Sequence, residues 1–319
     1  MQTVKLIYDN AKPTELRVPA EMGSPNKGQL IGLKRDRLAE LAGRVCYDSL
    51  GAEKSRGSVD FHAHIREVGH LSVYEHPTFT VGIPFADADA TLFLNRPALW
   101  VIPDRAASEW RVTLNLRHAH EWRGSRWGIG ATPVAVYNRI AATANAVAPL
   151  SFPGDPWPYG TSALRSPDYD AERYLSFYVG GVSRGLSHEL VRHGDYTAIS
   201  QRSTRYCDES ESDYAWHPLT RKFYGEAETP LAYHGMLAEA EKAAKRAYAE
   251  TVDALVGLGH DRKSARGAAR GVLGNALATE LIFTASLPQW REILRQRGGP
   301  WADQEIREMA EKIREFIPE

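Results

Sequence analysis

Residues 183–206, SRGLSHELVRHGDYTAISQRSTRY, combine the side-chain types that bind oxygen-rich anions. Apolar residues recur at helical spacing over 183–193, which predicts an amphipathic helix. Its polar face carries His188, Glu189, Arg192 and His193. The pattern breaks at Gly194 and Asp195, and nearly every side chain over 200–206 is then a hydrogen-bonding group. Guanidinium groups bind phosphate with two parallel hydrogen bonds, and hydroxyl and backbone N–H groups complete such sites. The stretch therefore indicates a site for an anion such as a nucleotide, with a solvated surface loop as the alternative.

The flanking sequence predicts the helices and strands that would position this stretch. Strands are expected where apolar residues alternate, and helices where they recur every three to four residues. The expected strands lie near 4–8, 79–83 and 174–179 and before Ser286. The expected helices cover 34–47, 59–69 and 230–258, with a further helix before Gly274 and two after Ser286.

Composition narrows the class of protein. The chain has 319 residues, of which 43% are apolar and 25% are charged, and this is ordinary for one large globular domain or two. Its net charge of −1 gives no reason to expect nucleic acid or a membrane surface as a partner. Its two cysteines, Cys46 and Cys207, are too few for a disulfide framework or a four-cysteine metal site, and each is expected to be structural. Because neither a secretory signal nor an apolar run of ~20 residues is recognisable, a soluble cytoplasmic protein is expected.

Several blocks of the chain resemble the flavin-dependent thymidylate synthases. SHELVRH followed by SQRSTRY is similar to the family's motif, a helix ending Arg-His-Arg and a Ser-rich segment ending Ser-x-Arg-Tyr. GRVCYDSL at 43–50 and VGHLSVYEH at 68–76 resemble two earlier blocks, the second a His-x-Ser/Thr-x-x-Glu-His run that approaches flavin and folate. AARGVL at 268–273 and LRQRGGPWADQEIR at 294–307 resemble two later blocks. These blocks stand in the family's order, which makes the resemblance more specific than any single block.

The resemblance implies an α+β fold in which an antiparallel sheet is covered by helices, and a single domain spanning 1–319. In the family the Arg-His helix directly follows the strand near 79–83, whereas here about ninety residues intervene. We expect residues at about 85–173 to form a large ordered insertion, because they include Trp100, Trp110, Trp122, Trp127 and Trp157. Within it, SEWRVTLNLRHAHEW faintly resembles LIFTASLPQWREIL near the C-terminus, and one short similarity is weak evidence for a repeat.

The resemblance also implies a reaction. The family transfers the methylene group of methylenetetrahydrofolate to C5 of a uridylate, with reduced FAD as carrier and hydride source and NADPH as the reductant of the flavin. It acts as a homotetramer with FAD and nucleotide at the subunit interfaces. The predicted partners are therefore dUMP or UMP, folate and further copies of this chain.

Residue roles follow from matching positions. Arg297 corresponds to the arginine that donates hydrogen bonds to the pyrimidine and is predicted to be catalytic, whereas Arg295 is not. We expect Arg205, Arg270 and Arg297 to converge on one pyrimidine monophosphate, once neighbouring subunits are considered. The implied substrate-binding residues are Glu189, Arg192, Gln201, Arg202, Ser203, Thr204, Arg205, Arg270 and Arg297. The implied cofactor-binding residues are His70, Ser72, Glu75, Arg192, His193 and Tyr196.

The chain departs from the family's pattern near Gly194 and Asp195. The second arginine of Arg-His-Arg is missing, and one extra residue lies between Arg192 and Arg205. Some relatives in nucleoside-antibiotic pathways methylate UMP, and a carboxylate or an enlarged turn near the ribose could admit a 2′-hydroxyl. We therefore keep both dUMP and UMP as candidate substrates.

Two other function classes remain open at this stage. His62-x-His64 and His118-x-His120 suggest a metal-dependent hydrolase. The first pair falls in an expected helix, where residues two apart point about 200° away from each other and cannot share one ion. The second pair could share one face of a strand. The other alternative is a non-catalytic relative that binds a nucleotide, and no metal is predicted by our preferred interpretation.

Overall fold

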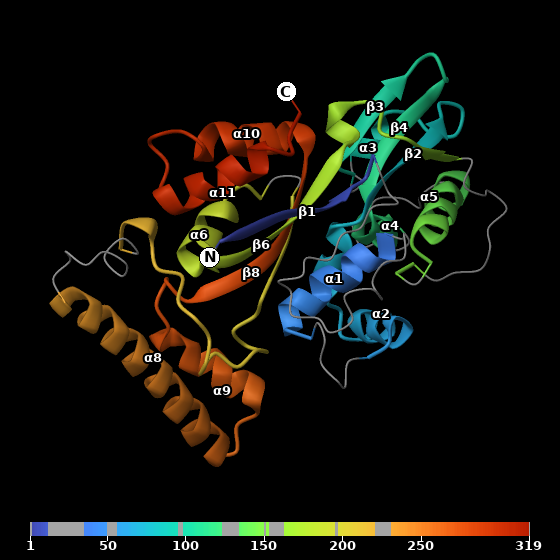
Figure 1. Ribbon diagram of the computed structural model, residues 1–319. Coiled ribbons are helices and arrows are strands. Elements are labelled where there is room, and N and C mark those ends of the chain that lie inside the picture. Colours follow the sequence, from blue (N-terminus) through green and yellow to red (C-terminus); the bar gives the residue numbers. More distant parts are fainter. Residues whose placement is uncertain are drawn as a thin grey trace.

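The computed structural model describes residues 2–11, 35–49, 56–94, 98–122, 134–149, 151–152, 163–194, 197–220 and 231–318 (Figure 1). Within these residues the strands form two four-stranded sheets, and all strand pairs are antiparallel. The first sheet has the order β1-β6-β8-β7, with β1 at Thr3–Asp9, β6 at Tyr174–Ser183, β7 at Ala198–Gln201 and β8 at Ala278–Ser286. The second has the order β3-β4-β2-β5, with β2 at Thr78–Pro84, β3 at Trp100–Asp104, β4 at Glu109–Asn115 and β5 at Leu164–Arg165.

Helices cover both sheets, which confirms the predicted α+β class. One face of the first sheet packs on α6 (Arg184–Leu190), α10 (Leu287–Arg297) and α11 (Gln304–Arg314) through a core that includes Phe177, Phe283 and Trp290. A second core joins the second sheet to α1 (Arg35–Tyr47), α2 (Ser58–Glu67), α4 (Leu116–Trp122) and α5 (Val134–Val147). Tyr178 and Ile282 of the first sheet belong to that second core, so the two sheets share buried contacts.

The remaining helices form a separate layer. The long helix α8 (Leu231–Gly257) packs on α9 (Arg262–Ala269) through a small core around Tyr248 and Ala265.

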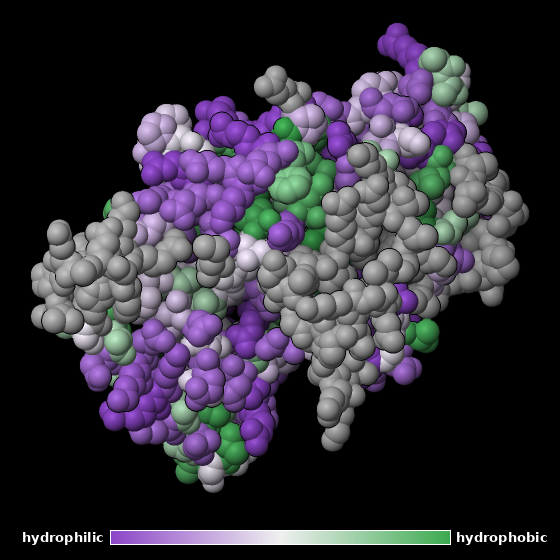
Figure 2. All heavy atoms as spheres, in the orientation of Figure 1, coloured by the Kyte–Doolittle hydropathy of each residue, from purple (hydrophilic) through white to green (hydrophobic). Residues whose placement is uncertain are grey.

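Four short elements complete the fold. In the sequence, η2 (Leu71–Glu75) precedes β2, α3 (Thr91–Leu94) lies between β2 and β3, η4 (Asp170–Glu172) precedes β6, and η5 (Arg270–Val272) follows α9. In Figure 1, α8 and α9 lie below the first sheet, and α10 and α11 lie above it. Figure 2 shows mainly hydrophilic residues over these four helices, and apolar residues near the middle of the same face.

Most expected helices and strands are present, with three differences. Residues 198–201, expected to be loop, form β7, which pairs with β8, and the buried hydroxyl of Ser200 has a partner in His76. His118 and His120 lie on helix α4 rather than on a strand. The resemblance implies one antiparallel sheet, whereas β2 belongs to a second sheet, in which it pairs with β4 and β5 of the segment expected to be an insertion.

Within that segment, Trp122 is buried, and the indole N–H groups of Trp100 and Trp110 donate to the Tyr174 hydroxyl and to the Ala88 carbonyl at 3.1 and 2.9 Å. Trp127 and Trp157 lie outside the described residues. Among the described residues, no helix is both long and apolar enough to cross a membrane.

Candidate functional site

Helix α10 carries Arg297 in its last turn. The helix begins at Ser286, whose Oγ accepts a hydrogen bond from the backbone N–H of Gln289, and Pro288 occupies its first turn, where a missing N–H costs nothing. Arg297 reaches the end of α6, where its Nε donates to His193 Nε2 at 2.9 Å and its two terminal nitrogens donate to Glu189 Oε2 at 2.8 Å and to the Glu189 carbonyl at 3.2 Å. The guanidinium plane is therefore held in a fixed orientation by one residue pair.

The electrostatics of this group keep His193 neutral. Burial, and secondly the charge of Arg297, lower the pKa of His193, and its Nε2 can accept from Arg297 only in the neutral form. Burial raises the pKa of Glu189, while Arg297 opposes that change. Arg295 lies on the exposed face of α10 and pairs with Glu292, so it takes no part in the group.

A polar cavity of about 640 Å³ adjoins Arg297. It is lined by Arg192, His193, Gln289, Glu292, Gln296 and Arg297. Two guanidinium groups, two amides, a neutral imidazole and the Glu292 carboxylate provide donors and acceptors around this space. Such a lining suits an anion, or the carbonyl and N–H edge of a planar ring.

A second group of arginines lies at the turn after β7. Ser203 donates its backbone N–H to the Cys46 carbonyl at 3.1 Å, which anchors the turn to α1. Thr204 is buried, and its hydroxyl accepts from Arg270 at 3.4 Å. The neighbouring Arg205 is exposed, and its Nε would lie 3.7 Å from a Cβ atom placed on Gly267 of α9. The Arg205 side chain therefore lies within van der Waals reach of α9.

Arg184, which sequence reasoning did not select, belongs to the same neighbourhood. Burial lowers its pKa, and the charge of Arg270 acts in the same direction. Lys263 of α9 lies 4.9 Å from the ring centre of Tyr206. This concentration of cations beside a hydroxyl-rich turn is suited to a phosphate group.

The VGHLSVYEH block meets this turn through an aromatic contact. His70 Nδ1 and the Tyr47 hydroxyl are 2.8 Å apart, and the Tyr47 ring packs edge-on against Tyr206 with ring centres 4.8 Å apart. Burial lowers the pKa of His70 and raises the pKa of Tyr47 to about 12, with Tyr206 contributing to the latter. Tyr47 was also missed from the sequence, although it lies in the GRVCYDSL block.

The other residues of that block have different surroundings. Ser72 is half-buried. Glu75 forms an ion pair with Arg117, and burial raises the pKa of Glu75. His76 is fully buried between Thr284 Oγ1 at 2.8 Å and Ser200 Oγ at 2.9 Å, and burial lowers its pKa to about 3. As a neutral imidazole, His76 therefore joins the VGHLSVYEH block to the first sheet through two hydrogen bonds.

Gln201 and Arg202, also predicted to bind substrate, have several partners within the chain. Gln201 Nε2 donates to Ser187 Oγ at 2.9 Å and to Thr279 Oγ1 at 3.1 Å. Arg202 pairs with Glu209 at 2.6 Å and with Asp48 at 3.0 Å, and these carboxylates raise its pKa despite the opposing effect of burial. Both residues orient the turn that carries Arg205.

Within one chain the predicted residues thus form two groups. Arg192, His193 and Arg297 line the cavity beside α10, where Glu189 holds Arg297. Ser203, Thr204, Arg205 and Arg270 lie at the turn beside α9. Convergence of Arg297 with Arg205 and Arg270 requires a second chain and stays a prediction. Tyr196 and Asp195 lie outside the described residues.

Neither cysteine is suited to nucleophilic chemistry. Both are buried and free, and burial raises the pKa of Cys46 to about 11 and that of Cys207 to about 12. Among the described residues, no group of three or more His, Cys, Asp or Glu side chains could hold a metal ion. The helical positions of both His-x-His pairs agree with this result, and the structure does not favour the hydrolase alternative.

Comparisons with known proteins match the C-terminal half of the chain. Residues 172–319 match the family described as Thymidylate synthase complementing protein. A flavin-dependent thymidylate synthase of Mycobacterium sp. (strain KMS) is 36% identical over 147 residues, which cover 43% of this chain and 55% of that protein. The corresponding protein of Mycobacterium tuberculosis (strain CDC 1551 / Oshkosh) is 36% identical over 143 residues, with 43% and 54% covered.

The chain thus spans about half the length of these curated relatives. Among solved structures, Thymidylate Synthase X from Helicobacter pylori with FAD and dUMP is 19% identical, with a TM-score of 0.33, and the match covers 46% of this chain and 68% of that one.

Proposed function

We propose that this chain belongs to the flavin-dependent thymidylate synthase family, which the similarity of residues 172–319 supports, and that the protein methylates C5 of a uridine monophosphate, dUMP or UMP. The single observation that carries the proposal is the fixed Arg297 guanidinium, held by Glu189 and neutral His193 at the edge of a polar cavity. The proposed co-substrates are methylenetetrahydrofolate and NADPH, and the proposed cofactor is FAD.

Arg297 acts on the pyrimidine. Carbon 5 of uracil must become nucleophilic, and negative charge then develops on the carbonyl edge of the ring. A guanidinium that is already oriented stabilises this charge without reorganising, and one such donor typically contributes about 3–4 kcal/mol to the transition state. Arg297 is oriented before any substrate binds, because Glu189 and His193 accept from three of its N–H groups.

Arg205 and Arg270 hold the phosphate in this proposal. Their guanidinium groups lie at one hydroxyl-rich turn, where Ser203 and Thr204 can complete the shell around the phosphate oxygens. The nucleotide then spans the Arg205 group of one chain and the Arg297 group of another, and we propose a homotetramer with nucleotide and FAD between chains.

The donors lining the cavity fit a polar cofactor ring and its phosphates. Arg192, His193, Gln289 and Gln296 supply them on one side, and His70 and Ser72 lie on the side of the Arg205 turn. Bound FAD supplies the one-carbon transfer and hydride chemistry. The protein's residues bind and orient the reactants, and the neutral His193 imidazole fixes Arg297.

The missing arginine near Gly194 bears on the choice of sugar. A turn enlarged by one residue and carrying the Asp195 carboxylate could accept the 2′-hydroxyl of UMP. An antibiotic pathway would be one setting for such a UMP methylase.

The experiment is turnover by the purified protein. Methylated product should form only with methylenetetrahydrofolate, NADPH and a uridylate present together, and the protein should carry FAD absorbance. UMP and dUMP are compared at equal concentrations, and a strong preference for dUMP removes the idea of an altered sugar site. A protein that binds uridylate but neither carries flavin nor oxidises NADPH is a non-catalytic relative.

A further inference from the structure

The two sheets repeat one arrangement of strands. In the second sheet β2, β3 and β4 follow one another in sequence and lie in the order β3-β4-β2, and in the first sheet β6, β7 and β8 lie in the order β7-β8-β6. Neither set pairs its first strand with its second, although strands adjacent in sequence usually pair or lie side by side. In both sets a short 3₁₀ turn precedes the first strand, a helix links the first two strands, and two helices follow the third.

The register of the two sets is the same. Thr78 to Pro84 pair with Asn115 to Glu109 without a shift, and Tyr174 to Gly180 pair with Ser286 to Glu280 in the same way. On the other side Trp100 pairs with Thr113, and Ala198 pairs with Thr284. Thr113 and Thr284 therefore occupy equivalent places, 171 residues apart (284 − 113), and Thr80 and Ser176 are equivalent, 96 residues apart (176 − 80).

Hydrogen bonds other than those between the strand backbones follow the same correspondence. The N–H of Leu116 donates to the Pro77 carbonyl at 3.1 Å, and that of Leu287 donates to the Arg173 carbonyl at 2.8 Å. Asn115 and Ser286 cap the helices that follow. The hydroxyls of Thr80 and Thr113 are 2.9 Å apart, and those of Ser176 and Thr284 are 2.7 Å apart.

The sequences agree along the third strand and its helix. Four residues recur at the same separation of 171. These are Glu109 and Glu280, Thr113 and Thr284, Leu116 and Leu287, and Glu121 and Glu292. The short similarity of SEWRVTLNLRHAHEW to the C-terminal segment thus coincides with structurally equivalent positions. The match to the family begins at residue 172, where the second set begins.

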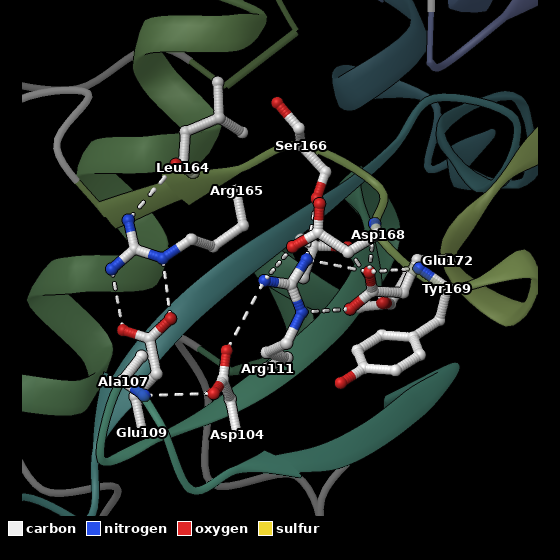
Figure 3. Close-up of polar contacts among 12 residues, drawn as sticks. Asp104, Ala107, Glu109, Arg111, Leu164, Arg165, Ser166, Asp168, Tyr169 and Glu172 are labelled. Carbon is white, nitrogen blue, oxygen red and sulfur yellow. Dashed lines mark hydrogen bonds and ion pairs between the residues drawn. The ribbon is translucent and has the colours of Figure 1, made fainter.

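Each set also inserts one buried residue into the sheet of the other. His76, two residues before Thr78, bonds to Thr284 and Ser200 of the first sheet. Its counterpart Glu172, two residues before Tyr174, receives two 2.8 Å hydrogen bonds from Arg111 of the second sheet (Figure 3). Both residues are 0% exposed. Reciprocal contacts of this kind are typical of two copies related by an approximate twofold axis.

The two sets differ in the functional residues they contain. The block with His70 and Ser72 precedes β2, whereas the equivalent segment before β6, residues 166–172, reads SPDYDAE. Conversely, β3 joins β4 through residues 105–108 alone, whereas residues 202–277 between β7 and β8 carry Arg205 and Arg270. Each set therefore contains residues that the other lacks.

We propose that the chain contains two diverged copies of one structural unit, of which the N-terminal copy has kept the His70 block and the C-terminal copy has kept the arginines. The N-terminal copy serves as a built-in partner that presents His70 to the nucleotide turn of the same chain, through the Tyr47 to Tyr206 contact. One FAD and one uridylate site per chain follow. This inference rests on the proposed function, and it adds which residues of one site come from the same chain.

Complementation between inactive full-length chains tests the inference. His70→Ala and Arg205→Ala chains are co-expressed with different affinity tags, and mixed assemblies are isolated by tandem purification. If both residues serve a site within one chain, every site in the mixture has a defect and no activity returns. The matched control pairs Arg205→Ala with Arg297→Ala. In the proposed site Arg205 and Arg297 come from different chains. A mixed assembly then contains sites in which one chain supplies Arg205 and the other supplies Arg297, and these sites should be active. Circular dichroism confirms that each variant is folded.

The FAD content gives a readout that does not depend on turnover. One FAD per chain, measured by absorbance after unfolding the purified wild-type protein, is expected. Two FAD per chain, or recovery of activity by the His70 and Arg205 pair, overturns this inference and leaves the proposed function intact. A protein that binds neither FAD nor uridylate contradicts both.

Discussion

Replacing Arg297 with lysine separates the charge of this residue from its geometry. Lysine keeps the positive charge beside Glu189 but has one ammonium group on a flexible stem instead of a planar fork. It cannot donate to His193 Nε2 and to Glu189 Oε2 from fixed directions, as Arg297 does at 2.9 and 2.8 Å. The Arg297→Lys variant therefore tests whether a fixed donor is needed for the reaction.

The contacts of Arg297 predict separate effects of the Arg297→Lys change on the free energy of unfolding and on kcat. Loss of the bonds to His193 and to the Glu189 carbonyl, at about 1 kcal/mol for each partly exposed bond, costs about 2 kcal/mol of unfolding free energy. Loss of an oriented donor to the pyrimidine lowers kcat by about 10²–10³-fold. We expect the KM for uridylate to change much less, because in the proposed mechanism the phosphate is held by Arg205 and Arg270.

The assay measures methylated product by chromatography at saturating folate and NADPH, and stability by urea unfolding. Arg295→Lys is the matched control: Arg295 lies on the same helix two residues earlier but pairs with exposed Glu292. Its kcat should equal that of the wild type, and its stability should change by no more than about 0.5 kcal/mol. An Arg297→Lys protein that keeps kcat within threefold of the wild type would refute the reasoning.

Three further predictions concern stability and reactivity. Because the pKa of His76 is about 3 in the folded protein, the unfolded chain binds the extra proton as the pH falls below about 6.5, and the native state loses about 1.4 kcal/mol per pH unit down to the folded pKa. His76→Gln should remove that part of the slope in urea unfolding between pH 7 and pH 5, and equal slopes would contradict the assignment. Glu172→Gln removes a fully buried carboxylate from the buried Arg111 guanidinium and should cost about 3–5 kcal/mol. Asp168→Asn, at a 62% exposed carboxylate 2.8 Å from the same guanidinium, should cost no more than about 1 kcal/mol, and similar losses in both variants would show that burial is not decisive. Finally, both thiols, with pKa values of about 11 and 12, should resist a disulfide reagent at pH 8 until urea is added, and rapid labelling of the native protein would contradict their burial.

Local periodicity predicted the helices well, and it failed where partners come from distant parts of the chain. Helix α1 was expected from its apolar positions, because one face of a helix must meet the core. Strand β7 was not expected, because Ser200 and Gln201 read as loop residues. Their side chains are satisfied by His76 and by Ser187 and Thr279, and no local pattern can indicate such long-range pairing.

The site was predicted as a set of residues but not as an arrangement. Matching blocks predict Arg205, Arg270 and Arg297 as site residues, but a match along the sequence does not state which of them reach one site from the same chain. The structure separates Arg297 from the other two within one chain and adds Arg184 and Tyr47 through contacts between distant segments. Such neighbours follow from sheet register, which a short motif does not encode.

The long interval between the His70 block and the Arg192 helix has a physical explanation in the repeated unit. His76 and Glu172 are equivalent and lie 96 residues apart (172 − 76), close to the ninety residues by which the helix is delayed. An unstructured loop of this length beside a binding site would be unusual. A second copy of the unit instead contributes its own sheet and its own core, and it exchanges buried contacts with the first. The interval then adds a folded partner to the chain, which keeps the His70 block close to the Arg205 turn.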